Sequence, residues 1–328
     1  MRKLFVGLMA FIAMNTMAAT QINGAGATFP YPLYSKWFSE YSKENKDIQI
    51  NYQAIGSGGG IRQLIQETVD FGASDAPMSD NDKSKATRQI LQIPTVLGAV
   101  AISYNVSEVT ANIKLDGDTL AKIFLGEISK WNDPKIAALN EGLKLPAKDI
   151  LVVRRADGSG TTSIFADYLS TVSKDWETQV GRGKTLKWPT GIGAKGNDGV
   201  TGAISQNDGA IGYIELAYAI NNNLKVAALK NKAGEYKLPT VQGVSLAAAK
   251  VKSISEVTNS IVDADGKGVY PISSFTYILL PVKEKDAKIV EVKKFLKWAL
   301  SKGQNFAAPL HYAPLPKRLA LEMLKEIK

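Results

Sequence analysis

The stretch VVRRADGSGTTSIF, residues 152–165, joins an apolar run, a turn of glycine, serine and threonine, and the start of a second apolar segment. This order predicts a β-strand that turns directly into an α-helix, which is the repeating unit of α/β proteins. The two arginines and the hydroxyl groups of the turn indicate a site for an anion. Asp157 stands among them, so the sequence raises the question of why an anion site should contain a carboxylate.

The same alternation of strand and helix continues on both sides of this stretch. Strands are predicted for the runs IQINYQAI (48–55), VDFGASDAP (69–77) and IPTVLGAVAISYNV (93–106), and strands or strand ends for GAIGYIELAYAI (209–220) and YPISSFTYILLP (270–281). Two amphipathic helices are predicted near the C-terminus, with apolar faces formed by Val292, Phe295, Leu296 and Ala299 and by Ala320, Met323, Leu324 and Ile327. The pattern therefore predicts the α/β fold class.

Length and composition narrow the class of protein further. A chain of 328 residues predicts two domains, and the lack of a repeat or long linker indicates lobes built from discontinuous parts of the chain. The absence of cysteine excludes disulfides, thiolate metal sites and thiol catalysis. The formal charge of +9 is spread along the chain without a basic stripe, so no nucleic-acid partner is expected.

The first eighteen residues predict a signal peptide. Arg2 and Lys3 precede an apolar run at residues 4–14, and small residues stand at Thr16 and Ala18. The apolar run is too short for a stable transmembrane anchor. We expect an exported protein that is cleaved near Ala18 and is not inserted into the membrane.

Three glycine-rich turns, each opening a predicted helix, carry the residues most suited to an anion. GAGATFP places Thr28 and Phe29 before one helix, GSGGG places Ser57 at the cap of a second, and DGSGTT places Ser159 and Thr161 at the cap of a third. A helix start offers unpaired N–H groups and the positive end of the helix dipole. Each hydroxyl taken alone is better explained as an ordinary helix cap, and only the recurrence of three such turns favours a shared site.

Other motifs fail on their details. GAGATF lacks the third glycine of a dinucleotide fingerprint, and GRGKT has Thr178 where a P-loop requires its first glycine. Neither Ser57 nor Ser159 lies in a G-x-S-x-G elbow, and DADGKG lacks the closing glutamate of a calcium loop. His311, the only histidine, is interpreted as a packing residue. The sequence therefore predicts no metal, no cofactor and no catalytic residue.

The motifs GAGATFPYPLYSKW, NYQAIGSGGGIRQLI, VDFGASDAPMSD, VVRRADGSGTTSIF and WPTGIGAKGNDGV closely resemble the periplasmic phosphate-binding proteins of ABC phosphate importers. The resemblance covers nearly all of the chain after residue 18. It implies a type II periplasmic-binding fold, with two α/β lobes, a ligand cleft and hinge crossings near residues 97–102 and 270–277. The implied lobes are residues 19–99 with 273–328, and residues 100–272.

The resemblance also implies the ligand, the partners and the site. The expected ligand is inorganic phosphate, and the expected partners of this periplasmic monomer are the membrane permease subunits of an importer and its ATPase. The family's ligand residues correspond to Thr28, Phe29, Ser57, Asp75, Arg155, Asp157, Ser159, Gly160 and Thr161.

Physical chemistry gives the two acidic members of this set different expected roles. Asp157 can fix the guanidinium of Arg155 by a charge-assisted bond. Asp75, when ionised, only accepts hydrogen bonds, so it favours an anion that still carries a proton. Phosphate keeps a proton near neutral pH and sulfate does not. We expect Asp75 to select protonated oxyanions over sulfate.

Two other kinds of function stay open at this point. One is a secreted phosphatase or phosphotransferase that uses Ser57 or Ser159, although a base and metal ligands are missing from the sequence. The other is a binder of sulfate, molybdate or a similar oxyanion on the same fold, which the carboxylate of Asp75 disfavours. A surface role in adhesion or signalling would leave no local signature.

Overall fold

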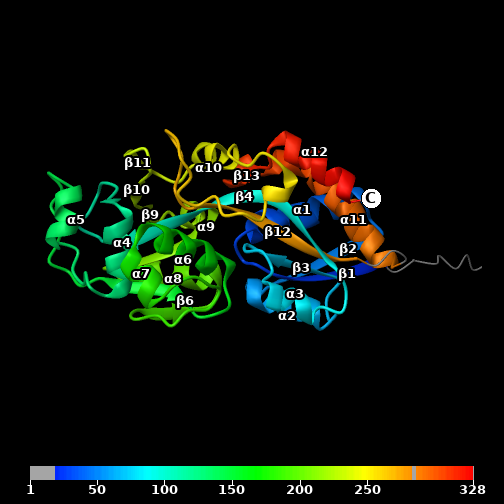
Figure 1. Ribbon diagram of the computed structural model, residues 1–328, viewed down its shortest axis with the longest axis horizontal. Helices are drawn as coiled ribbons and strands as arrows, with labels where there is room; N and C mark the ends of the chain where they lie inside the picture. The colour runs from blue at the N-terminus through cyan, green and yellow to red at the C-terminus, as the bar shows by residue number, and fades with distance from the viewer. Residues whose placement is uncertain (1–18, 283–285, 328) are drawn as a thin grey trace, which may run out of the picture.

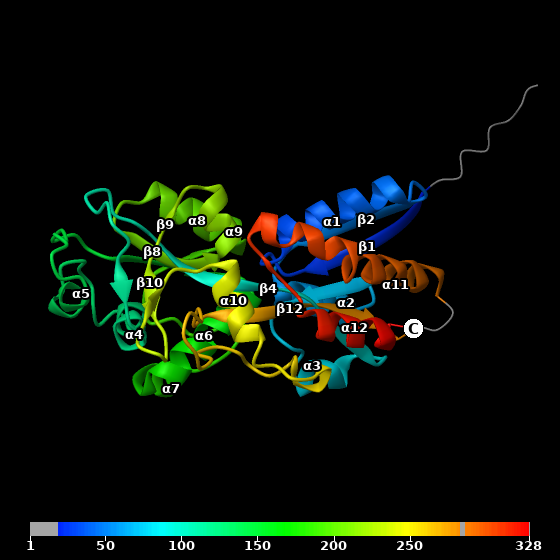
Figure 2. The same ribbon diagram turned by 90° about the horizontal axis from the view of Figure 1, so that it is seen from above.

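A computed structural model describes residues 19–282 and 286–327 (Figure 1). The predicted signal peptide, residues 1–18, lies outside the described residues. Figures 1 and 2 show two halves side by side along the long axis, one formed by the green and yellow middle of the chain and the other by the blue N-terminal and orange-red C-terminal parts. The half formed by the N-terminal and C-terminal parts is thus discontinuous in sequence, as expected from the absence of a linker.

One ten-stranded sheet runs through both halves. Its main strands are, in spatial order, β2 (Ile48–Ala54), β1 (Thr20–Gly26), β3 (Phe71–Ser74), β12 (Ser273–Pro281), β4 (Ile90–Asn105), β8 (Ala210–Glu215), β6 (Leu151–Arg155) and β7 (Ile192–Ala194). The short strands β13 (Ala313–Pro314) and β9 (Lys225–Val226) also pair with β4. A separate small sheet contains β11 (Tyr236–Lys237), β10 (Ala228–Lys230) and β5 (Lys114–Leu115).

The long strand β4 connects the two halves. Its first part, through Ala99, pairs antiparallel with β12, and its second part, from Val100, pairs antiparallel with β8. Both Ala99 and Val100 are fully buried. The change of partner falls inside the first crossing expected from the sequence. The lobe boundaries expected from the sequence, residues 19–99 with 273–328 and residues 100–272, stay a prediction.

The half that contains both ends of the described chain is covered by α1 (Tyr31–Glu44), α2 (Ser57–Ile65), α3 (Asp80–Lys85), α11 (Ala287–Ala299) and α12 (Lys317–Glu326), with the short 3₁₀ helices η1 (Ile254–Glu256), η2 (Lys302–Phe306) and η3 (Ala308–Leu310) nearby. Phe38 of α1 packs on Phe295 of α11 with ring centres 5.3 Å apart. The predicted apolar face of α11 is confirmed, since all four of its residues are buried. In α12, Ala320 and Met323 are buried as predicted.

The other half contains α4 (Gly117–Leu125), α5 (Pro134–Leu139), α6 (Gly160–Val172), α7 (Lys174–Gln179), α8 (Gly196–Gln206), α9 (Leu216–Asn221) and α10 (Val241–Ala248). Its core is aromatic. Phe165 of α6 stacks on Tyr213 of β8 at 4.3 Å between ring centres, and Trp188 stacks on the same tyrosine at 5.8 Å. This packing fixes the start of α6 relative to the strands that precede it.

Two local details differ from the sequence-based predictions. The run at 209–220 is a strand only as far as Glu215, whose carboxylate accepts a hydrogen bond from Ala217 N and caps α9. The cap of α2 is Gly56 and not Ser57. Gly56 has φ of 87°, which favours glycine, and Ser57 becomes the first residue of the helix.

Within the described part of the chain, no helix is long and apolar enough to cross a bilayer.

Candidate functional site

Four helices begin where the two halves meet. α1 and α2 follow the carboxyl ends of β1 and β2, while α6 and α8 follow β6 and β7 of the other half. The backbone N–H of Gly58 donates to the carbonyl oxygen of Gly158 across the junction at 2.8 Å. The crevice at the carboxyl ends of strands is where α/β proteins hold ligands. In this structure the halves are closed on each other at this crevice.

Thr28 and Phe29 form the turn between β1 and α1, and both are buried. The hydroxyl oxygen of Thr28 accepts hydrogen bonds from the side-chain amide of Asn197 at 2.8 Å and from its backbone N–H at 3.2 Å. The carbonyl oxygen of Phe29 accepts a bond from the hydroxyl of Tyr312 at 2.7 Å. The ring of Phe29 packs against Gly98 of β4, so this side chain anchors the turn in the core.

Ser57 and Asp75 lie together on the same side of the crevice. The hydroxyl oxygen of Ser57 accepts a bond from Asp75 N at 3.2 Å and lies 3.4 Å from Asp75 Oδ2. The other carboxylate oxygen of Asp75 accepts a bond from the hydroxyl of Thr276 at 2.8 Å. Only 2% of Asp75 is exposed.

Burial changes the protonation of Asp75. Loss of water around the carboxylate raises the pKa of Asp75 to about 7, an effect opposed by the Thr276 hydrogen bond and by the positive charge of Arg155. Near neutral pH this group therefore exists in both protonation states. As a carboxylate it only accepts hydrogen bonds, and as a carboxylic acid it also donates one.

Arg155 and Asp157 form a nearly buried ion pair. Arg155 Nε donates to Asp157 Oδ1 at 2.7 Å, and Arg155 Nη2 donates to Asp157 Oδ2 at 2.5 Å. The backbone N–H of Gly196 donates to Asp157 Oδ1 at 3.1 Å. The neighbouring guanidinium outweighs burial and lowers the pKa of Asp157. Asp157 thus stays ionised and holds the guanidinium plane, with Nη1 turned toward Thr161 Oγ1 at 3.4 Å.

Ser159, Gly160 and Thr161 form the buried start of α6. The hydroxyl oxygen of Ser159 caps the helix by accepting a bond from Thr162 N at 3.0 Å. Gly160 approaches the opposite half so closely that a methyl group on it would stand 2.4 Å from Ser57 Oγ and 2.5 Å from Asp75 Oδ2. The start of α6 therefore faces Ser57 and Asp75 directly.

The structure brings the nine predicted residues into one cluster at this junction, and it adds two that the sequence analysis did not select. Asn197 of α8 donates to both Thr28 and Thr161, and Thr276 of β12 donates to Asp75. A signal for Asn197 was present, because GNDGV is a fourth glycine-flanked helix start. Nothing in the local sequence around Thr276 distinguishes it from other residues of its strand.

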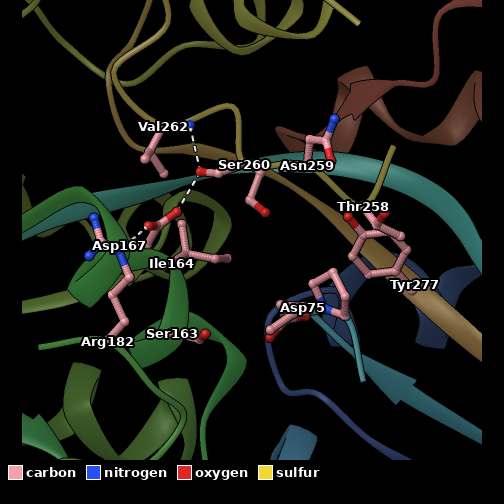
Figure 3. A pocket seen from close by; sticks show the side chains of 13 residues that line it. Asp75, Ser163, Ile164, Asp167, Arg182, Thr258, Asn259, Ser260, Val262 and Tyr277 are labelled. Atoms are coloured by element: carbon pink, nitrogen blue, oxygen red, sulfur yellow. Dashed lines mark hydrogen bonds and ion pairs between the residues drawn. The ribbon is translucent and has the colours of Figure 1, made fainter. Parts of the chain in front are cut away.

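A pocket of about 180 Å³ adjoins the cluster beside Asp75 (Figure 3). Asp75 and Tyr277 lie on one side of it, while Asp167 and Arg182 lie on the other. Arg182 Nε donates to Asp167 Oδ1 at 2.9 Å, and the hydroxyl of Ser260 donates to the same carboxylate. A second ion pair, between Lys184 and Asp82 at 3.2 Å, joins the two halves nearby.

The described residues contain no cluster of three or more histidine, cysteine, aspartate or glutamate side chains suited to a metal. Ser57 has a carboxylate neighbour, and the hydroxyl of Ser159 serves as a helix cap. His311 follows η3 and is half-buried. What the cluster offers chemically is a set of oriented donors, one buried cation and one buried carboxyl group whose protonation changes near neutral pH.

Comparison with known proteins gives consistent results. A family model described as a PBP superfamily domain matches residues 14–302. The chain is 46% identical to the phosphate-binding protein PstS of Pasteurella multocida, over 95% of this chain and 91% of the relative. It is 44% identical to the phosphate-binding protein PstS of Haemophilus influenzae, over 91% and 90% of the two chains.

Solved structures share the fold at lower sequence identity. A high-affinity periplasmic phosphate-binding protein (PfluDING) bound with phosphate superposes with a TM-score of 0.72 at 23% identity, over 92% of both chains. A phosphate-binding protein from Stenotrophomonas maltophilia gives a TM-score of 0.70 at 19% identity, over 93% of both chains. The expected periplasmic-binding-protein fold of two α/β lobes is thereby confirmed.

Proposed function

This chain belongs to the PstS family of phosphate-binding proteins, and from that membership we propose that it binds inorganic phosphate in the periplasm and delivers it to an inner-membrane ABC importer. The observation that carries the proposal is the cluster at the junction of the two halves, which are the two lobes of the fold. There the buried, oriented cation of Arg155 stands with hydroxyl groups from both lobes at the starts of helices. These are the elements that hold a multiply charged oxyanion without water.

Each predicted residue has a distinct part in this site. Arg155 supplies the positive charge, and Asp157 fixes its plane. Thr28, Ser57, Ser159 and Thr161 supply hydroxyl groups. Phe29 and Gly160 have no polar side chain, so they contribute backbone N–H groups at helix starts. Closure of the lobes brings the two sets of donors onto one ligand.

Asp75 gives the site its selectivity. An ionised Asp75 accepts a short hydrogen bond from a protonated phosphate oxygen, whereas sulfate offers only lone pairs to it. A buried acceptor left without a donor costs free energy, so sulfate is rejected. The raised pKa of Asp75 confines this rejection to pH values at which the carboxyl group is ionised.

The proposed protein is a carrier and not an enzyme, with no metal and no cofactor. Its partners are the permease subunits and ATPase of the importer, and it acts as a monomer with no nucleic-acid partner and no insertion into the membrane. The enzymatic alternative is weaker, because the two candidate serines have no histidine partner among the residues described. The named relatives are binding proteins as well.

Calorimetry on protein stripped of phosphate tests the binding function. The expected result at pH 8 is saturable binding of one phosphate per chain and no measurable binding of sulfate at equal concentration. A phosphate-free preparation that takes up neither anion would refute the proposal. N-terminal sequencing of the protein from a periplasmic fraction tests export, with Ala19 expected as the first residue.

A further inference from the structure

Asn197 lies between two threonines that belong to opposite lobes. It is fully buried in the first turn of α8. Its side-chain nitrogen Nδ2 donates to Thr28 Oγ1 at 2.8 Å and to Thr161 Oγ1 at 3.1 Å. One amide group therefore joins the two hydroxyl groups that face the proposed ligand from either side.

The backbone of Glu215 fixes the orientation of the Asn197 side-chain amide. The backbone N–H of Glu215 donates to Asn197 Oδ1 at 2.9 Å. A backbone N–H has no acceptor capacity, so the side-chain atom that faces it has to be the carbonyl oxygen. The NH₂ group is left to point at the threonines, which can only accept from it.

The two threonine oxygens are thereby saturated as acceptors. Thr28 Oγ1 accepts from Asn197 Nδ2 and from Asn197 N, and Thr161 Oγ1 accepts from Asn197 Nδ2 and from Arg155 Nη1. A hydroxyl oxygen has two lone pairs and one hydrogen. Across residues 19–282 and 286–327, neither hydroxyl donates a hydrogen bond to another protein atom.

We propose that Asn197 is a positioning residue that turns the hydroxyl hydrogens of Thr28 and Thr161 toward the bound anion. The inference rests on the proposed phosphate site. With both threonines fixed as donors, the ligand has to present unprotonated oxygens to them. Its remaining proton then has its acceptor at Asp75. Asn197 thus sets the direction of the hydrogen bonds in the site, although its own side chain has no atom left for the ligand.

A double-mutant cycle tests whether Asn197 acts through the threonines. Asn197→Ala removes one of the two donors to each threonine oxygen, so each hydroxyl hydrogen can turn away from the ligand. We expect the dissociation constant for inorganic phosphate to rise at least about tenfold. In a Thr28→Val, Thr161→Val background the same change has nothing left to orient. There we expect less than about a threefold effect, measured by calorimetry with titration into the millimolar range.

Asn140 offers a matched control. It is also a buried asparagine whose side chain makes three hydrogen bonds, two to Lys114 and one to Ile136. It follows α5 at the far end of the lobe that also contains Asn197 (Figure 1). Asn140→Ala should lower the melting temperature and leave phosphate affinity within about threefold, which separates loss of stability from loss of positioning.

Asn197→Asp is a second variant of nearly unchanged size. It keeps an oxygen for Glu215 N but presents only acceptors to the threonines, so their hydrogens turn away from the ligand. We expect weaker phosphate binding than in Asn197→Ala. Binding equal to or tighter than that of the alanine variant would overturn the inference, as would an undiminished Asn197→Ala effect in the double-valine background. Failure of the unmodified protein to bind phosphate would instead overturn the proposed function.

Discussion

The guanidinium of Arg155 is held by Asp157 along one edge, through Nε at 2.7 Å and Nη2 at 2.5 Å. This pair explains why a carboxylate stands inside the predicted anion site. Asp157 uses one edge of the guanidinium and leaves Nη1 directed into the cluster. Its negative charge also balances part of the positive charge while no anion is bound. In the proposed site the carboxylate therefore orients the cation and does not compete with phosphate.

Arg155→Lys should weaken phosphate binding by about 10- to 150-fold. A lysine ammonium retains the charge, but it cannot donate along one edge to Asp157 and from another edge to a ligand. Hydrogen bonds to charged groups contribute about 1.5–3 kcal/mol each, which corresponds to this range. Calorimetry with phosphate provides the measurement.

The adjacent Arg154 is the control for this substitution. Alternation along β6 turns its side chain to the other face of the strand, where its Nη1 lies beside Gly193 of β7. Arg154→Lys should change phosphate affinity by less than about threefold. Equal losses from the two substitutions would mean that the effect is one of general charge or stability and not of the Arg155 geometry.

Gly160→Ala should prevent full closure of the lobes. The added methyl group would stand within 2.5 Å of Ser57 Oγ and Asp75 Oδ2, which belong to the opposite lobe. Overpacking of this kind costs about 1–3 kcal/mol, so phosphate affinity should fall by about 5- to 150-fold. Small-angle scattering with saturating phosphate should show a larger radius of gyration than for the unmodified protein.

Gly202→Ala in α8 is the control for Gly160→Ala. A methyl group there meets no atom within 4 Å. Because alanine is the better helix former by about 0.5–1 kcal/mol, this variant should be slightly more stable and bind phosphate normally. If Gly160→Ala behaved in the same way, the closed junction described above would be irrelevant to binding.

The fold class and the cluster at the α6 start could be predicted because their signals are local. The strand, turn and helix that carry Arg155, Asp157 and Ser159 are contiguous, so one short motif specifies their geometry. Thr276 could not be selected in this way, and the local motif GNDGV marks Asn197 only as a residue at a helix start. Asn197 reaches Thr161 from 36 positions away along the chain. Thr276 reaches Asp75 from 201 positions away. Such pairings depend on how the sheet is assembled, which local patterns do not record.

The first residue of a helix is also hard to predict from sequence, for a different physical reason. Ser57 has the side chain of a good cap, but Gly56 can adopt a positive φ and ends the preceding loop one residue earlier. The hydroxyl of Ser57 is thereby released from capping and contacts Asp75. At the start of α2, the backbone conformation available to Gly56 therefore sets the boundary, and the capping preference of the Ser57 side chain does not.

Selectivity against sulfate should weaken as pH falls. Above its pKa of about 7, Asp75 is a carboxylate and repels an anion that has no proton to donate. Below that pKa, Asp75 carries a proton and can donate it to a sulfate oxygen. Competition calorimetry should therefore detect little sulfate binding at pH 8 and clear binding at pH 5. Phosphate keeps at least one proton over this range and should bind at both values.

Asp75→Asn should remove this pH dependence. The amide presents a donor at every pH, so sulfate should bind equally well at pH 5 and pH 8. Sites built to pair with a ligand hydroxyl reject analogues that lack it by about 10⁴-fold. The variant should therefore lose most of the difference between its affinities for phosphate and for sulfate. If the variant still excluded sulfate at both pH values, the selectivity would have to come from shape or from Asp157.

The free energy of unfolding should carry the same signature of Asp75 in protein free of phosphate. The pKa of Asp75 in the folded state, about 7, exceeds the value near 4 of an unfolded aspartate. Between these two values the folded state binds a proton that the unfolded state does not bind, so stability falls as pH rises. The slope from this one group is at most about 1.4 kcal/mol per pH unit, and it ends above pH 7, where both states are ionised.

Asp75→Asn has no such group, so its stability relative to the unmodified protein should grow from pH 4 to pH 7 and then stay level. Urea unfolding of both proteins across pH 4–8 measures the difference directly. A difference that stayed constant over this range would mean that Asp75 titrates normally in the folded protein, and the pH-dependent selectivity argued above would lose its physical basis.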